Sequence, residues 1–173
     1  MINDDFIICV ATNEEKEALV PKEYWDYTII TGIGIGNVLK SLHAINKFNI
    51  KNIINVGYAG AKGIEKGTTC FVDMCLTYQE HDLNQFSYLL TLPKTKLPIY
   101  NCYTSTDFVT SSKLKEPFLV DMELLAYTAL PLYANVYSIK CVSDNMNLDD
   151  YNISLQKDFT GDVKKALIDI GVE

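Results

Sequence analysis

Three carboxylates stand beside apolar segments that are typical of buried β-strands. Asp144 follows the apolar run 136–142 after a single residue, and Glu15 comes a few residues after the apolar run 6–10. Because ligands collect outside the carboxyl ends of the strands in open α/β sheets, these two carboxylates could face one pocket. Glu123 falls in the first turn of a predicted helix, where interaction with the helix dipole is the simplest role. Taken singly, each is more simply explained by structure than by catalysis, so the three are informative only in combination.

Glycine-containing segments also follow apolar strands, which raises the question of nucleotide binding. Gly32 and Gly34 begin the dinucleotide fingerprint G-x-G-x-x-G, but Asn37 stands where the third glycine belongs. The acidic residue expected about 20 positions later is also missing. A Walker-type loop is excluded because the sequence has no Gly-Lys-Ser/Thr. A tight turn beside a helix explains these glycines equally well, and we predict a second glycine turn at 57–60.

The composition excludes several classes of partner. The chain has 173 residues, with 15 basic against 22 acidic side chains, so we expect no nucleic acid partner. All the basic residues are Lys, so no guanidinium is available to bind phosphate through two hydrogen bonds. Five cysteines without a CxxC pair, and only two histidines, give a poor ligand set for zinc. We therefore expect reduced core cysteines and no metal.

The N-terminal residues are acidic and unlike a secretory signal. No apolar run approaches the ~20 residues that a membrane span requires. From these features we expect a soluble cytoplasmic protein with no membrane partner.

The hydrophobic pattern predicts an α/β fold. The continuous apolar run 6–10 is typical of a strand buried on both faces, followed by a helix that Thr12 or Asn13 could cap. A strand at 27–30, a helix from residue 38 with Asn37 as its cap, and a strand at 51–56 form a right-handed parallel crossover. Further strands are expected at 68–76, 99–109 and 136–142, helices at 121–130 and 155–170, and loop between 76 and 99.

Four short motifs occur in a fixed order along the chain. They are Gly32-Ile33-Gly34, the segment 53–60, Val120-Asp121-Met122-Glu123 and Val142-Ser143-Asp144. In this order they resemble the nucleoside phosphorylase superfamily. The Glu-rich turn at 11–15 is most similar to that of the 5′-methylthioadenosine/S-adenosylhomocysteine nucleosidases. The resemblance implies one domain over residues 1–173, a three-layer α/β/α fold with a mixed, mainly parallel central sheet, and no cofactor.

The resemblance also implies a role for each carboxylate. Asp144 would be the general acid that protonates N7 of a leaving purine. Glu123 would accept hydrogen bonds from the ribose hydroxyls, which strengthen as the sugar gains oxocarbenium character. Glu15 would deprotonate the attacking water on the opposite face of the ring. Substrate contacts are implied for Gly34, Tyr58, Ala59, Gly60, Phe108, Met122 and Ser143.

Several positions leave alternatives open. Phe108 matches the aromatic residue that stacks on the purine, although an ordinary core Phe would have the same sequence context. Tyr58 departs from the Ser or Thr that is usual in the family, and its ring would fill space near the site of water or phosphate. His81 and Asp82 resemble a His-Asp pair of the family, to which we assign no catalytic role beyond a contact near the pocket for the 5′ substituent.

The implied activity is hydrolysis of the N-glycosidic bond of a purine nucleoside, as in methionine salvage. Relatives complete the pocket for the 5′ substituent with a neighbouring chain, so we expect a homodimer. The absence of Arg favours water over phosphate as the nucleophile, but Lys or a helix N-terminus can also bind phosphate, so a phosphorylase stays an alternative. The segments 19–27 and 90–98 are shorter than usual, which leaves room for a relative that binds a nucleoside without turnover. The third alternative is a generic nucleotide-binding domain.

Overall fold

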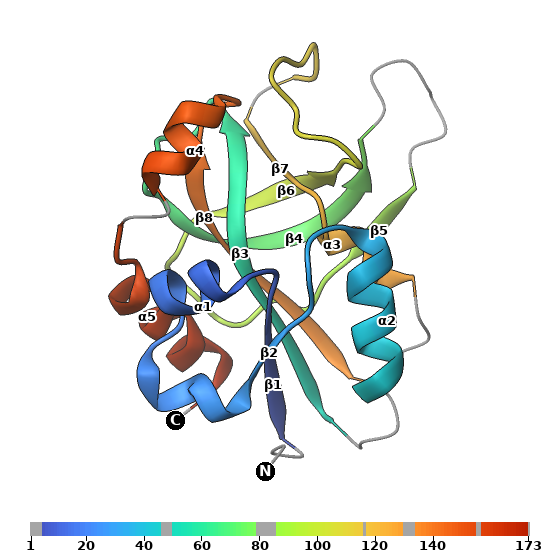
Figure 1. Cartoon of the computed structure of the whole chain (residues 1–173), viewed down its shortest axis with the longest axis vertical. Coiled ribbons are helices and arrows are strands. Elements are labelled where there is room, and N and C mark those ends of the chain that lie inside the picture. The colour runs from blue at the N-terminus through green and yellow to red at the C-terminus, as the bar shows by residue number, and fades with distance from the viewer. Residues whose placement is uncertain are drawn as a thin grey trace.

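The computed structural model describes residues 5–45, 50–78, 86–115, 117–129, 134–154 and 157–172. Within these ranges eight strands form one sheet, and helices lie on both sides of it (Figure 1). The strands are β1 (Phe6–Val10), β2 (Thr28–Ile30), β3 (Asn52–Lys62), β4 (Thr69–Thr77), β5 (Ser87–Leu89), β6 (Ile99–Thr104), β7 (Phe118–Asp121) and β8 (Asn135–Asp144). The helices are α1 (Asn13–Leu19), α2 (Ile35–Ile45), α3 (Leu124–Thr128), α4 (Leu148–Ser154) and α5 (Thr160–Ile170), with a 3₁₀ helix at Lys22–Tyr27. None of the helices in the described ranges has the length and apolar character needed to span a membrane.

β1 lies inside the sheet, between β2 and β3 and parallel to both. Ile7 and Cys9 pack on the face that α2 and α3 cover, whereas Ile8 and Val10 pack on the face that α1 and α5 cover. Burial on both faces explains why this strand is apolar at every position. Five of the eight strand pairings in the described ranges are parallel. The predicted α/β fold with a mixed, mainly parallel sheet and helices on both sides is confirmed.

Part of the sheet closes on itself, which the sequence did not indicate. β3 pairs with β8, β8 with β4, β4 with β6, β6 with β7, and β7 returns to the far end of β3. These five strands therefore form a ring, and β1 and β2 extend the sheet from β3 on one side (Figure 1). The ring brings the ends of β3, β7 and β8 together, although they are far apart in the sequence.

The glycine turn predicted at 57–60 is wrong. This segment continues β3, and it pairs with β8 in a register that matches Gly57 with Lys140 and Tyr58 with Cys141. The pairing is irregular only between Ala59 and Gly60. The glycines serve close approach rather than a turn, because a Cβ on Gly57 would lie 3.3 Å from a carboxylate oxygen of the neighbouring α1.

The prediction that Asn37 caps the second helix is also wrong. α2 begins before Asn37, whose side-chain amide donates to the carbonyl of Ile33 at 2.8 Å. The carbonyl of Gly34 accepts an early helical N–H, from Val38 at 3.3 Å. Gly34 has φ +85°, a left-handed conformation that glycine adopts without steric cost.

Two predicted helices are shorter than expected, and each adjoins an element that was not predicted. In the segment 121–130 the helix α3 is preceded by the strand β7, which ends at Asp121. In the segment 155–170 the described helix is α5, and a separate helix, α4, comes before it. The stretch between 76 and 99 includes the short strand β5. These short elements are stabilised by partners distant in sequence, which a local pattern does not reveal.

Candidate active site

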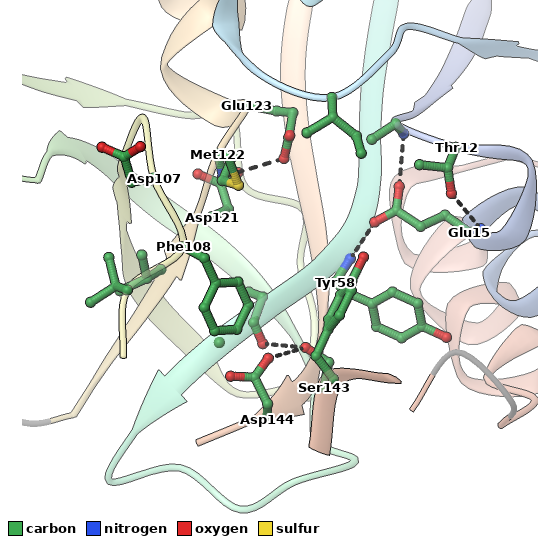
Figure 2. Close-up of a pocket in the computed structure, with 17 residues that line it drawn as sticks. Thr12, Glu15, Tyr58, Asp107, Phe108, Asp121, Met122, Glu123, Ser143 and Asp144 are labelled. Carbon is green, nitrogen blue, oxygen red and sulfur yellow. Dashed lines mark hydrogen bonds between the residues drawn. The ribbon is translucent and has the colours of Figure 1, made fainter. Parts of the chain in front are cut away.

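A cavity of about 200 Å³ lies where β1, β3, β7 and β8 end (Figure 2). All three carboxylates singled out from the sequence line it, although they come from separate parts of the chain. The predicted site residues in its lining are Glu15, Tyr58, Ala59, Gly60, Phe108, Met122, Glu123, Ser143 and Asp144. The remaining predicted residue, Gly34, is not part of the lining but contacts it through Glu123.

Glu15 is fixed on one side of the cavity by main-chain donors. Its Oε2 accepts the N–H of Ala11 at 2.7 Å, and its Oε1 accepts the N–H of Tyr58 at 3.0 Å (Figure 2). Thr12, one of the two candidate caps, caps α1 by accepting the N–H of Glu15 at 3.1 Å. Burial raises the pKa of the Glu15 carboxyl, while these hydrogen bonds and the nearby Lys140 ammonium lower it. A buried, oriented carboxylate of raised pKa is suited to accepting a proton.

Glu123 immediately precedes α3 rather than lying inside it. Its Oε1 accepts the N–H of Gly34 at 2.8 Å, and its Oε2 accepts the N–H of Met122 at 3.3 Å. Burial and the neighbouring carboxylate of Asp121 raise the pKa of Glu123 to about 7. Glu123 can therefore exist in both protonation states near neutral pH.

A buried ion pair lies beneath the cavity and was not predicted from the sequence. Lys140 Nζ lies 2.8 Å from Asp121 Oδ2, and the two side chains are only 1% and 0% exposed. Burial lowers the pKa of Lys140, but Asp121 and other groups raise it above its ordinary value. A Cβ on Gly57 would lie 3.3 Å from Glu15 Oε1 and 3.4 Å from Lys140 Nζ, so the ammonium also lies near Glu15. The available signal was Lys140 itself, the only basic residue of the strand predicted at 136–142. A charge buried in a strand requires a partner of opposite charge.

Asp144 ends β8 and is 1% exposed. Its Oδ2 accepts the hydroxyl of Ser143 at 2.7 Å, and its Oδ1 accepts the N–H of Asn147 at 3.1 Å. The hydroxyl of Ser143 is also 3.3 Å from the carbonyl of Ala59. A Cβ on Gly60 would lie 3.1 Å from Asp144 Oδ1, so a glycine at this position leaves space for the carboxylate. The carboxylate therefore has a defined orientation at the cavity wall (Figure 2).

Aromatic rings form another wall of the cavity. Tyr151 of α4, which was not predicted, makes edge contacts with Phe108 at 6.1 Å and with Tyr58 at 6.2 Å between ring centroids. Phe108 is 39% exposed, so it is not an ordinary core residue. Burial, followed by the charges of Glu15, Glu123 and Asp144, raises the pKa of Tyr151 to about 12.

Two residues noted in the sequence, His81 and Asp82, lie outside the described residues. The prediction that Tyr58 fills space near the reacting centre stays untested, although Tyr58 lines the cavity. The residues that sequence analysis missed are Asp121, Lys140 and Tyr151. Asp121 was part of a recognised motif, whereas Tyr151 carried no signal because α4 was not predicted.

Comparison with known proteins identifies the fold. No protein-family model and no curated protein matches the sequence. Solved structures do match, and they include methylthioadenosine/S-adenosylhomocysteine nucleosidases (MTAN), members of the nucleoside phosphorylase superfamily. The chain therefore has the fold of these nucleosidases, as the resemblance implied.

The individual matches extend over nearly whole chains. An Asp-to-Asn variant of MTAN from Chlamydia trachomatis, bound to MTA, has a TM-score of 0.73 and 18% identity over 100% of both chains. An Asp-to-Asn variant of Helicobacter pylori MTAN, with 5′-methylthioadenosine in its active site, has a TM-score of 0.72 and 13% identity over 98% of this chain and 99% of that one. S-adenosylhomocysteine nucleosidase from Streptococcus pyogenes, in complex with 5-methylthiotubericidin, has a TM-score of 0.67 and 16% identity over 99% of this chain and 96% of that one.

Proposed function

We propose that the protein is an enzyme that hydrolyses the N-glycosidic bond of a purine nucleoside. The observation that carries this proposal is the convergence of Glu15, Glu123 and Asp144 on one cavity within a nucleosidase fold. Cleavage of such a bond needs a proton for the departing base, stabilisation of the charged sugar, and a nucleophile. Each carboxylate is suited to one of these needs.

Asp144 is proposed as the general acid. Each of its oxygens accepts one protein hydrogen bond, which leaves a second position on an oxygen where the protonated carboxyl can carry the O–H that it donates to N7 of a purine. Phe108, which is partly exposed at the cavity, would stack on the purine face. As the glycosidic bond breaks, its electron pair passes to the base, and the proton from Asp144 neutralises it at N7. In support, two of the nucleosidase structures are Asp-to-Asn variants with a bound nucleoside.

Glu15 and Glu123 are proposed to act on the sugar. Glu15 would remove a proton from water, whose oxygen then bonds to the anomeric carbon. Glu123, when ionised, would accept hydrogen bonds from the ribose hydroxyls, and these bonds strengthen as positive charge develops on the ring. Met122, adjacent to Glu123 in the lining, and Gly34, which donates to Glu123, would help to shape this end of the site.

Water is favoured over phosphate as the nucleophile by the charge of the site. The cavity lining contains Glu15, Glu123, Asp144 and further acidic residues, and it contains no Lys among the described residues. The nearby ammonium of Lys140 is already paired with Asp121. A phosphate ion would therefore meet net negative charge in a site of low polarity, which is unfavourable.

The proposed enzyme has an expected class of substrate, oligomeric state and cellular location. The proposed substrates carry a 5′-methylthio or 5′-homocysteinyl group on adenosine, as in methionine salvage. A second copy of the chain would complete the pocket for that group, so the proposed enzyme is a homodimer. The five cysteines are free thiols, as in proteins of a reducing compartment, and we infer a cytoplasmic location.

The test is incubation of the purified protein with 5′-methylthioadenosine, S-adenosylhomocysteine and adenosine, each with and without phosphate. We expect release of adenine and a free sugar at a rate that does not depend on phosphate. Formation of a ribose 1-phosphate would establish the phosphorylase alternative instead. Tight binding by calorimetry without any adenine release would identify a binding protein.

A further inference from the structure

A chain of hydrogen bonds connects Tyr58 with the turn that carries Asp144. The phenol of Tyr58 donates to the carbonyl of Ser154 at 3.1 Å, and the hydroxyl of Ser154 donates to the carbonyl of Ser143 at 2.5 Å. The hydroxyl of Ser143 in turn donates to Asp144 Oδ2 at 2.7 Å. Tyr58, Ser154 and Ser143 are 5%, 3% and 1% exposed, so water does not readily replace these bonds.

The same tyrosine contacts the opposite end of the site through its backbone. The N–H of Tyr58 donates to Glu15 Oε1 at 3.0 Å, while its side chain extends toward α4. Edge contacts with Tyr151 and Phe159 fix the ring, at 6.2 Å and 5.9 Å between centroids. Substitution of the phenol therefore alters the α4 side of the site and leaves the hydrogen bond to Glu15 in place.

We propose that Tyr58 is a positioning residue, whose hydroxyl anchors the end of α4 and thereby orients Asp144 for proton transfer. This inference rests on the proposed function. The segment 145–154 leaves the sheet after Asp144 and returns to it at Ser154, where the two hydroxyl bonds fasten it to β3 and to the end of β8. Without the phenol hydroxyl, the carbonyl of Ser154 loses its donor, and Ser143 becomes less firmly positioned.

The first test compares two leaving groups. Adenine needs protonation as it leaves, whereas 4-nitrophenolate does not, so only the nucleoside reaction depends on the general acid. We expect Tyr58→Phe to lower kcat on the nucleoside about tenfold, as for the loss of one buried hydrogen bond, with KM changed less than about twofold. On 4-nitrophenyl riboside the loss should be less than about twofold.

The matched control is Tyr24→Phe, because Tyr24 is similarly buried, at 6% exposure, and packs edge-on against Phe6 outside the cavity. It should retain wild-type rates on both substrates. Ser154→Ala breaks the next bond in the chain, so the double variant Tyr58→Phe/Ser154→Ala should lose no more activity than the more impaired single variant. Equal losses on both leaving groups, or an unchanged nucleoside rate in Tyr58→Phe, would overturn the proposal.

A second readout separates this inference from the proposed function. Hydrogen exchange of the amides in 145–154 should be at least about threefold faster in Tyr58→Phe than in wild type, and unchanged in Tyr24→Phe. If the wild type cleaves no substrate, the proposed function fails, and the exchange result alone decides whether Tyr58 anchors α4. If the wild type is active but exchange in this segment does not change, the positioning role is wrong while the proposed function stands.

Discussion

The buried ion pair between Lys140 and Asp121 offers a test of the structure that does not require the substrate. Replacement of Lys140 by Met keeps the length of the side chain but removes its charge, and Asp121 is left without its cation at 0% exposure. Breaking a buried pair from one side costs about 3–5 kcal/mol of unfolding free energy. For a chain of 173 residues this corresponds to a decrease in Tm of roughly 6–20 °C.

A double variant and a control at an exposed ion pair test whether the loss of stability comes from the broken buried pair. Lys140→Met/Asp121→Asn removes both charges and keeps an acceptor for Thr104 Oγ1, which donates to Asp121 at 2.7 Å. The double variant should therefore be more stable than Lys140→Met alone by about 2 kcal/mol. The control is Lys165→Met, because Lys165 and its partner Asp162 are 71% and 50% exposed and solvent screens such a pair.

Urea and thermal unfolding, followed by circular dichroism, would measure all of these variants. A loss of less than about 1 kcal/mol in Lys140→Met, or a double variant less stable than either single variant, would refute the buried pair.

The remaining predictions concern the cavity. Because the pKa of Glu123 is raised to about 7, kcat/KM should rise as the pH increases through 7 and Glu123 becomes ionised, and Glu123→Gln should remove this rise from the pH-rate profile. Because folding raises this pKa, ionisation of Glu123 destabilises the folded state. Between pH 4.5 and pH 7 the free energy of unfolding of the wild type should therefore decrease by up to about 3 kcal/mol relative to that of Glu123→Gln, as measured by urea unfolding. Gly60→Ala should lower kcat about tenfold, because the new Cβ would lie 3.1 Å from Asp144 Oδ1. The control is Gly161→Ala, whose new Cβ would have no atom within 4 Å, and it should leave kcat unchanged in the same assay.

The local sequence pattern correctly predicted elements that are stabilised by neighbouring residues or buried on both faces. The run 6–10 is apolar throughout because both of its faces are covered, and Thr12 caps α1 because its hydroxyl accepts a nearby N–H. The segment 57–60 was mistaken for a turn because glycine is common in turns. Its partner for pairing is β8, some 80 residues further on, and only that pairing shows that the glycines make room for other side chains.

In the candidate site, too, local motifs identified some residues, whereas others depend on long-range strand pairing. Glu15, Glu123 and Asp144 were found because ordered motifs surround them, and all three line the cavity. The ion pair was missed because Lys140 and Asp121 become neighbours only when the ring of strands closes. Pairing over such distances is set by the register of the whole sheet, and no single segment of the sequence contains it.

The most direct measurement is the rate of adenine release from 5′-methylthioadenosine at pH 7 by the wild type and by Asp144→Asn. The amide of the substituted side chain has no carboxylic acid proton to donate, so we expect the variant to bind the nucleoside while its kcat falls by roughly 10²–10⁴. An Asp144→Asn variant that releases adenine as fast as the wild type would contradict the account.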